Sequence, residues 1–205
     1  YYQDGRIKIL DQNKKAQDEF DAFAAALEEK GIRVLLVQDQ IEFDTPDSIF
    51  PNNWISTHEN GDIALYPMFA ENRRRERRPD AMELMEAEGF QINNVIDYSS
   101  AEDEGFFLEG TGSLLLDRVN RKAYCSISPR ADEVNAYAGN MMQVHNDKGE
   151  RLLVMSDQAY KSLTASQIAK LEKYNEILHP SIATIETLGG GSVRCMMAEV
   201  FLPKA

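Results

Sequence analysis

The hydrophobic positions near the start of the chain follow a helical period. Over residues 14–30, apolar side chains recur every three or four positions, which places them on one face of a helix. The residues of this face are Ala16, Phe20, Phe23, Ala24 and Leu27. Gly31 follows at the position where a glycine commonly ends a helix. The almost wholly apolar run 32–37 comes next and predicts a buried strand.

Further along, short apolar segments alternate with turn residues, a pattern typical of strands and hairpins. One hairpin is predicted through Asn60-Gly61 and a second through Asn120, and Thr164 or Ser166 is expected to cap a later helix. The predicted strands are 54–58, 63–66, 91–96, 114–116, 123–127 and 152–155, the predicted helices are 77–88 and 163–174, and 192–202 is predicted as a turn followed by a strand. Because this order repeats a unit of strands plus one helix, we predict an α/β domain made of similar modules.

Composition and charge indicate the cellular compartment and exclude some classes of binding partner. The 205 residues, 43% of them hydrophobic, suffice for one sizeable domain or for two small ones. No apolar run approaches the roughly 18 residues that a membrane span requires. Cys125 and Cys195 are too few for a disulfide framework, so we expect a cytoplasmic protein without a membrane partner. The net charge of −12 argues against nucleic-acid binding, because phosphates would be repelled.

A run of arginines interrupts the acidic composition. Its members are Arg73, Arg74, Arg75, Arg77 and Arg78. Such a run is typical of a solvated helix start. Guanidinium groups can also hold a carboxylate through two parallel hydrogen bonds, so both interpretations stay open.

Glycines gather beside one of the two cysteines. Residues 189–191 are three consecutive glycines, and Cys195 follows them closely. Glycine lets the backbone approach a ligand closely, and a thiolate is a strong nucleophile where its surroundings lower the pKa of the thiol. This combination favours covalent chemistry at Cys195. The alternative is a glycine turn before a buried strand, with Cys195 as a small core residue.

Two further segments combine polar groups with apolar anchors. Residues 51–53 read Pro-Asn-Asn, which by itself is typical of a turn. Trp54 and a predicted strand follow at once, however, and would hold the two amides near the edge of a sheet. Glu109 stands between aromatic residues and two glycines. Such a carboxylate lies either at an exposed turn or at the mouth of a pocket that perturbs its pKa.

The histidines and the common ligand motifs offer less. His58, His145 and His179 each lie beside a turn or a proline, which favours a surface position. The sequence has no Cys/His metal spacing, no P-loop and no Gly-x-Gly-x-x-Gly string. We therefore expect neither a metal nor a nucleotide cofactor.

Several short strings, taken in order, resemble one family. They are 50–54 (Phe-Pro-Asn-Asn-Trp), 65–68 (Leu-Tyr-Pro-Met), 72–74 (Asn-Arg-Arg), 107–113 (Phe-Leu-Glu-Gly-Thr-Gly-Ser), 128–130 (Ser-Pro-Arg), 138–141 (Ala-Gly-Asn-Met) and 189–195 (Gly-Gly-Gly-Ser-Val-Arg-Cys). Together they resemble the citrulline-utilisation hydrolase type of the amidinotransferase, or pentein, superfamily. Its relatives include dimethylarginine dimethylaminohydrolase and arginine deiminase. The resemblance covers most of the chain after its first helix and strand.

The resemblance implies a fold and a chemistry. The fold would be a pentein-type β/α propeller of ββαβ modules around a pseudo-fivefold axis, here incomplete. The chemistry would be attack of a cysteine thiolate on the carbon of a guanidinium or related group, with a covalent adduct that water resolves and a histidine as general acid and base. It implies no cofactor and a small-molecule amino-acid substrate, and it leaves room for a homo-oligomer.

The resemblance also assigns roles to residues of this chain. Cys195 would be the nucleophile, and Glu109 would be the acidic residue that pairs with the catalytic histidine. The residues that bind the substrate would be Asp47 and Asn53 around its planar nitrogen group, Asn52 beside them, and Arg73 and Arg130 at its carboxylate.

One departure from the family pattern concerns the catalytic histidine. The strand that bears it in the family lies between the strings at 128–130 and 138–141, but only a few residues separate the two strings here. We therefore expect a single domain over residues 1–205, with a segment missing near 133–135 and a first module truncated at Tyr1. If the junction near 133–135 is covalent, a module is lost and activity is in doubt.

A second departure concerns charge. Relatives that act on guanidinium carry carboxylates where Asn52 and Asn53 stand. A carboxylate suits a cation, whereas an amide suits a neutral partner, because an unpaired buried cation costs far more than a buried urea. This difference points to a neutral ureido end, such as that of citrulline, although Asp47 and Glu109 still supply negative charge.

The leading hypothesis is therefore a cysteine-dependent hydrolase of non-peptide C–N bonds, acting on the guanidino or ureido group of an arginine-like or citrulline-like amino acid. The alternatives are a catalytically inactive pentein that binds a small amino acid or a protein partner, and a purely structural α/β domain. Under the leading hypothesis, Asp47, Asn53 and Glu109 converge on Cys195 at the rim of a pocket, outside the reach of the three histidines. Cys125, in contrast, is expected to be buried and inert.

Overall fold

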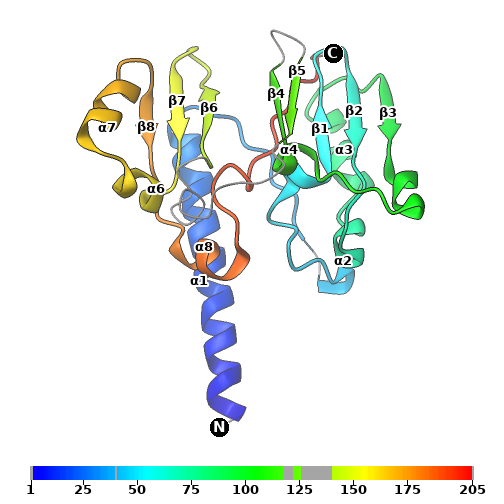
Figure 1. Cartoon of the computed structure of the whole chain (residues 1–205), viewed down its shortest axis with the longest axis horizontal. Helices are drawn as coiled ribbons and strands as arrows, with labels where there is room; N and C mark the ends of the chain where they lie inside the picture. Colours follow the sequence, from blue (N-terminus) through cyan, green and yellow to red (C-terminus); the bar gives the residue numbers. More distant parts are fainter. Residues whose placement is uncertain (1, 40, 118–121, 126–139, 205) are drawn as a thin grey trace. The chain divides into compact units, whose positions relative to one another are not determined.

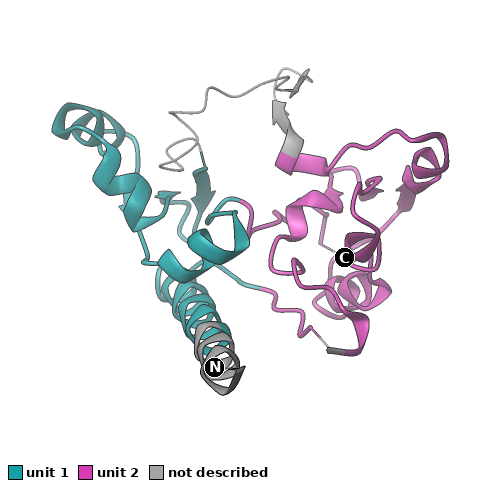
Figure 2. Ribbon diagram, turned by 60° about the horizontal axis from the view of Figure 1, so that its bottom comes forward, with its two compact units in different colours: residues 1–34, 129–194 teal, residues 35–128, 195–205 magenta. Residues whose placement is uncertain are grey.

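A computed structural model describes residues 2–39, 41–117, 122–125 and 140–204 of the chain. They divide into two compact units, which Figure 2 shows in different colours. Unit 1 comprises residues 1–34 and 129–194, and unit 2 comprises residues 35–128 and 195–205. Each unit combines helices with a three-stranded sheet.

Unit 1 begins with the longest helix of the described chain and continues with a sheet and shorter helices (Figure 1). Its described elements are α1 (Tyr2–Glu29), β6 (Met142–His145), β7 (Arg151–Val154), α6 (Asp157–Ser162), α7 (Ala165–Leu171), β8 (Glu176–Leu178) and α8 (Ala183–Gly189). The sheet has the order β6-β7-β8, with β6 antiparallel and β8 parallel to β7. It is therefore one ββαβ module, in which α6 and α7 form the crossover to the parallel strand.

The long helix buries the face that the sequence predicts. Phe23 and Leu27 of α1 are buried, and Gly31 ends the helix with a φ of +78°. The N–H groups of Gly31 and Ile32 donate to the carbonyl oxygens of Glu28 and Leu27, at 2.9 and 3.1 Å. This pair of bonds is a Schellman motif, and the left-handed conformation that it needs is why a glycine stands there.

The start of α8 is capped by a side chain of α1. The carboxylate of Glu19 accepts hydrogen bonds from the backbone N–H groups of Thr184 and Ile185, at 3.0 and 3.1 Å. N–H groups in the first turn of a helix have no partner within the helix. Glu19 therefore satisfies these groups from outside and ties α8, which leads into the glycine run, to α1.

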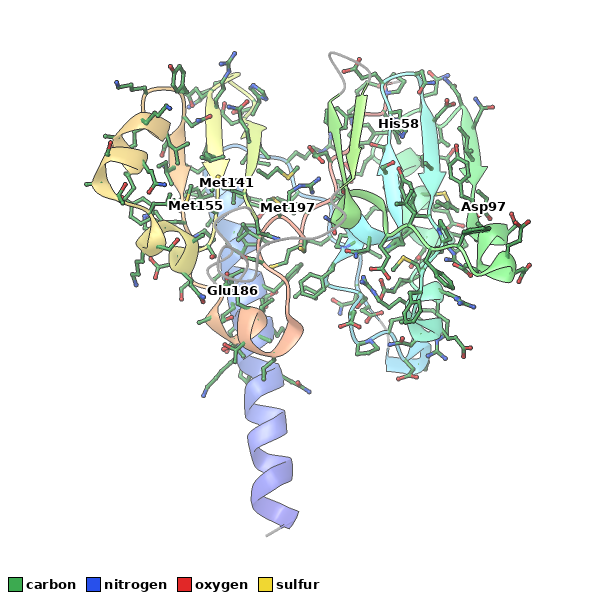
Figure 3. All side chains as sticks on the ribbon, in the orientation of Figure 1. His58, Asp97, Met141, Met155, Glu186 and Met197 are labelled. Atoms are coloured by element: carbon green, nitrogen blue, oxygen red, sulfur yellow. The ribbon has the colours of Figure 1, made fainter. Side chains whose placement is uncertain are left out.

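The core of unit 1 lies against its sheet. Leu153, Met155 and Ala159 form a buried cluster, and Met141 and Tyr160 pack against it. Figure 3 labels Met141 and Met155 at this sheet. The flexible methionines fill the space between the sheet and the crossover helices.

Unit 2 holds a second module and the start of a further one (Figure 1). Its described helical elements are η1 (Ile41–Phe43), η2 (Pro51–Asn53), α2 (Glu71–Arg74), α3 (Pro79–Ala87), η3 (Ser99–Glu104) and α4 (Gly110–Ser113). Its described strands are β1 (Ile55–Thr57), β2 (Asp62–Leu65), β3 (Asn94–Asp97), β4 (Leu114–Asp117) and β5 (Lys122–Cys125). The order β1-β2-β3, antiparallel and then parallel, repeats the topology of unit 1.

One buried cluster holds unit 2 together. Its members are Trp54, Ile55, Ile63, Leu65, Met68, Ala81 and Leu202. Burial of a large apolar side chain such as Ile63, which is fully buried, contributes about 2 kcal/mol. The cluster packs the crossover helix α3 and residues near the C-terminus against the β1–β2 hairpin. This packing anchors the loops that flank the hairpin.

Most of the predicted elements are present. The hairpin through Gly61, where φ is +84°, is β1–β2, and the second predicted hairpin is β4–β5. Helix α3 and strands β3 and β7 fall within two or three residues of their predicted positions. Thr164 rather than Ser166 caps α7, in a capping box with Gln167. The expected α/β fold of ββαβ modules is thus confirmed.

The predicted strand 32–37 is wrong. This run is irregular, and Leu36 and Val37 are 52% and 42% exposed. The boundary between the two units falls within it, after Val34. A strand needs a neighbouring strand to take its backbone hydrogen bonds, and hydrophobicity alone does not reveal that this segment is a connection.

The C-terminal prediction is right in its turn and wrong in its strand. Residues 193–196 form a turn, but 197–202 are not a strand, and only Lys204 forms an isolated bridge, with Phe90. Thr57 holds this segment instead: its hydroxyl donates to the carbonyl of Glu199 (2.9 Å) and accepts from the N–H of Phe201 (2.7 Å). Side-chain bonds of this kind leave no periodic pattern in a sequence.

The elements that the sequence analysis did not predict are β6, α6, β8 and α8 in unit 1 and the short helices η1, η2, α2, η3 and α4 in unit 2. They are three to seven residues long, which is too short for a period to stand out. The predicted residues 126–127 and the junction near 133–135 lie outside the described residues. Among the helices that the structure describes, none combines the length and the apolar composition needed to cross a bilayer.

Candidate functional site

The first part of the site is the loop that leads into β1. The backbone turns at 46–49, where the N–H of Phe50 donates to the carbonyl of Asp47 at 3.0 Å. Pro51 then opens η2, a position that suits its fixed φ. Trp54 follows directly and is buried in the core of unit 2. The tryptophan therefore anchors the loop that carries Asn52, which is fully buried, and Asn53.

A polar cluster on the other side of the same loop fixes the backbone around Asp47. The carboxylate of Asp39 accepts hydrogen bonds from the hydroxyls of Thr45 (3.1 Å) and Ser48 (2.6 Å). Arg78, which is buried, reaches the same carboxylate at 3.3 Å. Asp39 and Arg78 thus hold both flanks of Asp47 in place.

The second part of the site is the segment that begins at Glu109. Gly110 has a φ of +41°, and a Cβ added to it would stand 2.6 Å from the carbonyl oxygen of Asn52. Thr111 donates from its hydroxyl to the same carbonyl, at 3.3 Å. Only a glycine at 110 allows α4 to lie this close to η2, and this contact brings Glu109 to Asn53.

Glu109, Asn53 and Arg73 meet at one carboxylate oxygen. The side-chain amide of Asn53 donates from Nδ2 to Oε2 of Glu109 at 2.9 Å. Nη1 of Arg73 lies 3.7 Å from the same oxygen. Because Nδ2 of Asn53 is engaged with Glu109, the amide offers its Oδ1 as a hydrogen-bond acceptor. Three residues that the sequence assigns to the site, from separate segments, are thus side by side.

Arg73 also joins this group to the Asp47 loop. Its Nη2 donates to the carbonyl of Phe50 at 3.1 Å and to that of Asp47 at 3.5 Å. Its Nε and Nη2 bind the two oxygens of Glu76, at 3.0 and 2.9 Å. Arg73 and Glu76 are both buried, so the pair forms a bidentate salt bridge beneath the site.

The electrostatics of this pair follow from its burial. Burial alone lowers the pKa of Arg73, but its hydrogen bonds with Glu76 and the charges of Glu76, Glu109 and Asp47 outweigh this and raise it. Burial raises the pKa of Glu76, and the nearby carboxylates of Asp47 and Glu109 add to this against the opposing effect of Arg73. The negative charge of three carboxylates is therefore concentrated around a single guanidinium.

Glu76 was not among the predicted site residues. The sequence contained one signal for it, the i, i+3 spacing from Arg73, which places the two side chains on one face of a helical turn. Within a run of five arginines and several acidic residues, this spacing did not distinguish Glu76 from its neighbours.

The rest of the arginine run also pairs with carboxylates of the chain itself. Arg77 binds both oxygens of Glu102, at 2.6 and 3.2 Å, and Arg74 reaches Glu102 at 3.2 Å. Arg75 pairs with Asp44, at 2.9 Å. The run does lead into a helix, since its last arginine is the N-cap of α3. Of its members only Arg75 is exposed, however, so the run as a whole is not solvated. The bidentate fork is present, with protein carboxylates as partners.

Cys195 lies in the turn 193–196, just after α8. Gly190 ends α8 with a φ of +68°, and Val193 and Met196 on either side of the cysteine are buried. Cys195 itself is half-buried, and the described residues after it, 196–204, form no strand. The description of Cys195 as a core residue before a buried strand is therefore wrong. Cys195 belongs to unit 2, as Asp47, Asn53 and Glu109 do.

The backbone N–H of Arg194, the residue before Cys195, is held by a side chain. It donates to Oδ1 of Asn140 at 2.8 Å. Upstream, the buried hydroxyl of Ser192 donates to Glu186 at 2.7 Å, and Glu186 is labelled on α8 in Figure 3. These two bonds fix the backbone on the N-terminal side of the cysteine.

The three histidines have different environments. His58, labelled in Figure 3, follows β1 and is half-buried, with Nε2 3.2 Å from the hydroxyl of Ser56. His179 stacks on Tyr160, with ring centroids 4.0 Å apart. His145 ends β6 and is exposed, as expected. His58 is less exposed than a surface position implies, because its ring contacts the hydroxyl of the buried Ser56.

Two predicted residues lie where their side chains are not described. Arg130 is outside the described residues, and Cys125 ends β5 without a described side chain. Among the side chains that are described, no group of three or more His, Cys, Asp or Glu residues could hold a metal ion.

The repeated ββαβ topology, with a polar cluster in the loops that flank one hairpin, defines an α/β protein of the pentein class. Solved structures share this fold. AgrE in complex with ornithine and NAD+ is 14% identical, with a TM-score of 0.64 over 94% of this chain and 35% of that one. The N-terminal domain of ArgZ, an arginine dihydrolase from the ornithine-ammonia cycle in Cyanobacteria, is 14% identical, with a TM-score of 0.56 over 92% and 89% of the two chains.

A third structure is a dimethylarginine dimethylaminohydrolase bound to 4-chloro-2-hydroxymethylpyridine. It is 15% identical, with a TM-score of 0.57 over 89% of this chain and 90% of that one. The chain thus spans about a third of the length of AgrE and about nine-tenths of this dimethylaminohydrolase. No curated protein matches the sequence.

The family is given by the sequence itself. The model of the family described as N,N dimethylarginine dimethylhydrolase, eukaryotic, matches residues 2–136 and again residues 131–202. The chain belongs to this family, and with it to the pentein, or amidinotransferase, superfamily. The resemblance seen in the ordered motifs is therefore confirmed.

Proposed function

We propose that this protein is a cysteine-dependent hydrolase that cleaves a non-peptide C–N bond in the guanidino or ureido group of an arginine-like or citrulline-like amino acid. Its family supports hydrolysis of guanidino compounds. The observation that carries the proposal is the meeting of Asn53, Arg73 and Glu109 at one carboxylate oxygen, 2.9 and 3.7 Å from its two partners. We further propose that it acts in the cytoplasm without a cofactor, with a small amino acid as its partner.

Each group at this site fits a planar, nitrogen-rich ligand. A guanidino or ureido group presents several N–H donors in one plane, and the acceptors available to it are the Oδ1 of Asn53 and the carboxylates of Glu109 and Asp47. Asn52 lies beside them in η2. One of the two N–H groups of Asn53 Nδ2 binds Glu109. Oδ1 of Asn53 is the acceptor that N–H donors of such a ligand would face.

The proposed chemical step uses the thiol of Cys195. Its thiolate adds to the central carbon of the planar group, and the resulting tetrahedral adduct expels a protonated amine or ammonia as the leaving group. Water then adds to the same carbon, the C–S bond breaks, and the thiolate is regenerated. A general acid must protonate the leaving nitrogen, and the same group can then take a proton from the water.

The amides at positions 52 and 53 bear on the choice of substrate. Relatives that act on guanidinium have carboxylates there, which stabilise a cation. The carboxylates that remain near Arg73 are Glu76, Glu109 and Asp47, and the guanidinium of Arg73 already offsets part of their charge. The amides thus favour a neutral ureido end, as in citrulline, whereas three carboxylates against one guanidinium leave negative charge that suits a guanidinium.

Arg73 and Arg130 remain the proposed ligands of the substrate carboxylate. For Arg73 the available group is Nη1, because Nε and Nη2 are bound to Glu76 and to backbone carbonyls. A substrate carboxylate at Nη1 would share this guanidinium with Glu109. Arg73 would then hold the substrate and a binding residue at once.

A second candidate function is favoured by one observation, the division of the family match. The two matched stretches overlap at 131–136, the region where the strand with the catalytic histidine is expected in the family. This supports the proposal that a segment of the family fold is missing near 133–135. A chain without that strand would bind a small amino acid or a protein partner but would lack the general acid.

The experiment that tests the hydrolase is an assay of ammonia, methylamine or dimethylamine release from arginine, citrulline and methylated arginines. Turnover that is lost in Cys195→Ala, with the fold kept in circular dichroism, supports the hydrolase. Binding of one of these amino acids in calorimetry without any turnover supports the second candidate. A protein that neither turns over nor binds any of these amino acids contradicts both candidate functions.

A further inference from the structure

Gly112 lies directly against the amide of Asn53. A Cβ built on Gly112 would stand 2.7 Å from Nδ2, 3.0 Å from Cγ and 3.2 Å from Oδ1 of Asn53. Contacts under 3.0 Å with atoms of other residues are essentially never seen for a real Cβ. The missing side chain of Gly112 is thus the space in which the amide lies while it donates to Glu109.

The two glycines of α4 differ in what they make room for. Gly110 has a positive φ, and its Cβ would collide with the backbone carbonyl of Asn52 at 2.6 Å. A backbone atom cannot withdraw without shifting η2. Gly112 has no positive φ, and its Cβ would meet only the end of a side chain. An alanine at 112 therefore keeps the fold and moves the amide of Asn53.

From this contact, we propose that Gly112 is a positioning residue: it holds the Asn53 amide against Glu109 and thereby aims Oδ1 of Asn53 at the substrate. This inference rests on the proposed role of Asn53 as a substrate ligand. An added methyl group would turn the amide away from Glu109 Oε2, which breaks the 2.9 Å bond and frees Asn53 to adopt other rotamers.

The displacement of the Asn53 amide by the added methyl group should affect the rate of the reaction. A misplacement of about 1 Å in a group that orients a substrate can reduce the rate about 100-fold. Gly112→Ala should therefore lower kcat/KM by between about 10-fold and 100-fold, with the melting temperature nearly unchanged.

The matched control is Gly89→Ala. Gly89 has a φ of +81° and nothing within 4 Å of an added Cβ. Alanine there strains the backbone and touches no site residue, so it should lower the melting temperature and leave kcat and KM unchanged. The two variants thus separate displacement of Asn53 from a general loss of stability.

The decisive measurement is a double-mutant cycle in the full chain with Asn53→Ala. If Gly112 acts through Asn53, Gly112→Ala causes no further loss once the amide is absent, and the double variant matches Asn53→Ala within twofold. If the two losses multiply, or if Gly112→Ala has wild-type kinetics, the inference is wrong.

A second readout does not depend on turnover. The side-chain NH₂ signals of Asn53, assigned by their absence in Asn53→Ala, should shift in the ¹H–¹⁵N spectrum of Gly112→Ala and stay in place in Gly89→Ala. An unchanged Asn53 signal in Gly112→Ala overturns the inference. A wild-type protein without turnover or binding, but with the expected shift, contradicts the proposed function and leaves the contact between Gly112 and Asn53 established.

Discussion

The two ββαβ modules share a topology and differ in how their loops are held. In each, an antiparallel hairpin is followed by a helical crossover to a parallel strand. In unit 2 a buried salt bridge between Arg73 and Glu76 supports the loop before the first strand. The ion pairs described in unit 1, such as that between Lys30 and Glu176, are largely exposed. The sheets are therefore a common frame, and among the described residues the buried ion pair belongs to unit 2.

An asparagine stands at the same place in both modules. Asn53 precedes β1, which begins at Ile55, and Asn140 precedes β6, which begins at Met142. Asn53 donates to Glu109, whereas Asn140 accepts from the backbone N–H of Arg194, next to Cys195. The repeated position thus holds a proposed binding residue in one module and the backbone before the proposed nucleophile in the other.

The largest expected effect tests the buried charge of unit 2. Glu76→Ala leaves the guanidinium of Arg73 buried with one carboxylate fewer, and we expect it to lower the free energy of unfolding by about 3–5 kcal/mol. Urea denaturation measures the change. Glu76→Gln, which keeps part of the hydrogen bonding, should lose less. The control is Glu176→Ala in unit 1, which removes an exposed pair and should leave the transition unchanged. Equal losses in Glu76→Ala and Glu176→Ala would remove the contrast between the modules.

The intermediate effect tests the asparagine of unit 1. Asn140→Ala removes the acceptor of the Arg194 N–H, a loss of about 1 kcal/mol that should loosen the turn carrying Cys195. Alkylation of Cys195 by iodoacetamide, followed by peptide mass spectrometry so that Cys125 is read separately, should become about fivefold faster. Asn175→Ala is the control, since Asn175 donates to the carbonyl of Leu171 in the same unit. An unchanged alkylation rate in Asn140→Ala would mean that the turn is held by other contacts.

The frame of the fold was predictable because it rests on local patterns. The spacing of apolar residues revealed α1 from residue 14 onward, although the helix begins at Tyr2. The turn at Gly61 revealed the β1–β2 hairpin. The prediction of a strand at 32–37 was wrong for the opposite reason. The exposure of these residues depends on where the chain leaves unit 1, and this is a long-range property that hydrophobicity does not carry.

The candidate site was predictable only as a set of residues. Ordered motifs pointed to Asn53, Arg73 and Glu109, and the structure brings these three together. Their pairing was not predictable: the motifs suggested a histidine for Glu109, and its described partners are Asn53 and Arg73. The role of Gly112 depends on a contact across 59 positions of sequence, from 53 to 112, which only the packed loops reveal.

The smallest expected effect concerns pH and the outer part of the arginine run. Burial alone would raise the pKa of Glu102, but its hydrogen bonds with Arg77 and the Met68 N–H, together with the charge of Arg74, lower it below the usual 4.5. The folded state therefore binds this proton less readily than the unfolded state. The stability that Glu102 contributes is present above about pH 4.5 and is lost as the pH falls through the lowered pKa.

Glu102→Gln removes this titration while it keeps an acceptor for the Met68 N–H. The variant should be less stable than the wild type at pH 7 and should lose less stability as the pH falls from 5 through the lowered pKa of Glu102. Urea midpoints measured across this range give the comparison. Asp157, whose pKa is lowered mainly by a hydrogen bond from the exposed Lys161, provides the counterpart in unit 1. Asp157→Asn should change the loss of stability at acid pH less than Glu102→Gln does, because solvent screens the ion pair of Asp157. If Asp157→Asn changes the pH dependence of stability more than Glu102→Gln does, the charge that makes stability depend on pH lies in unit 1 and not in unit 2.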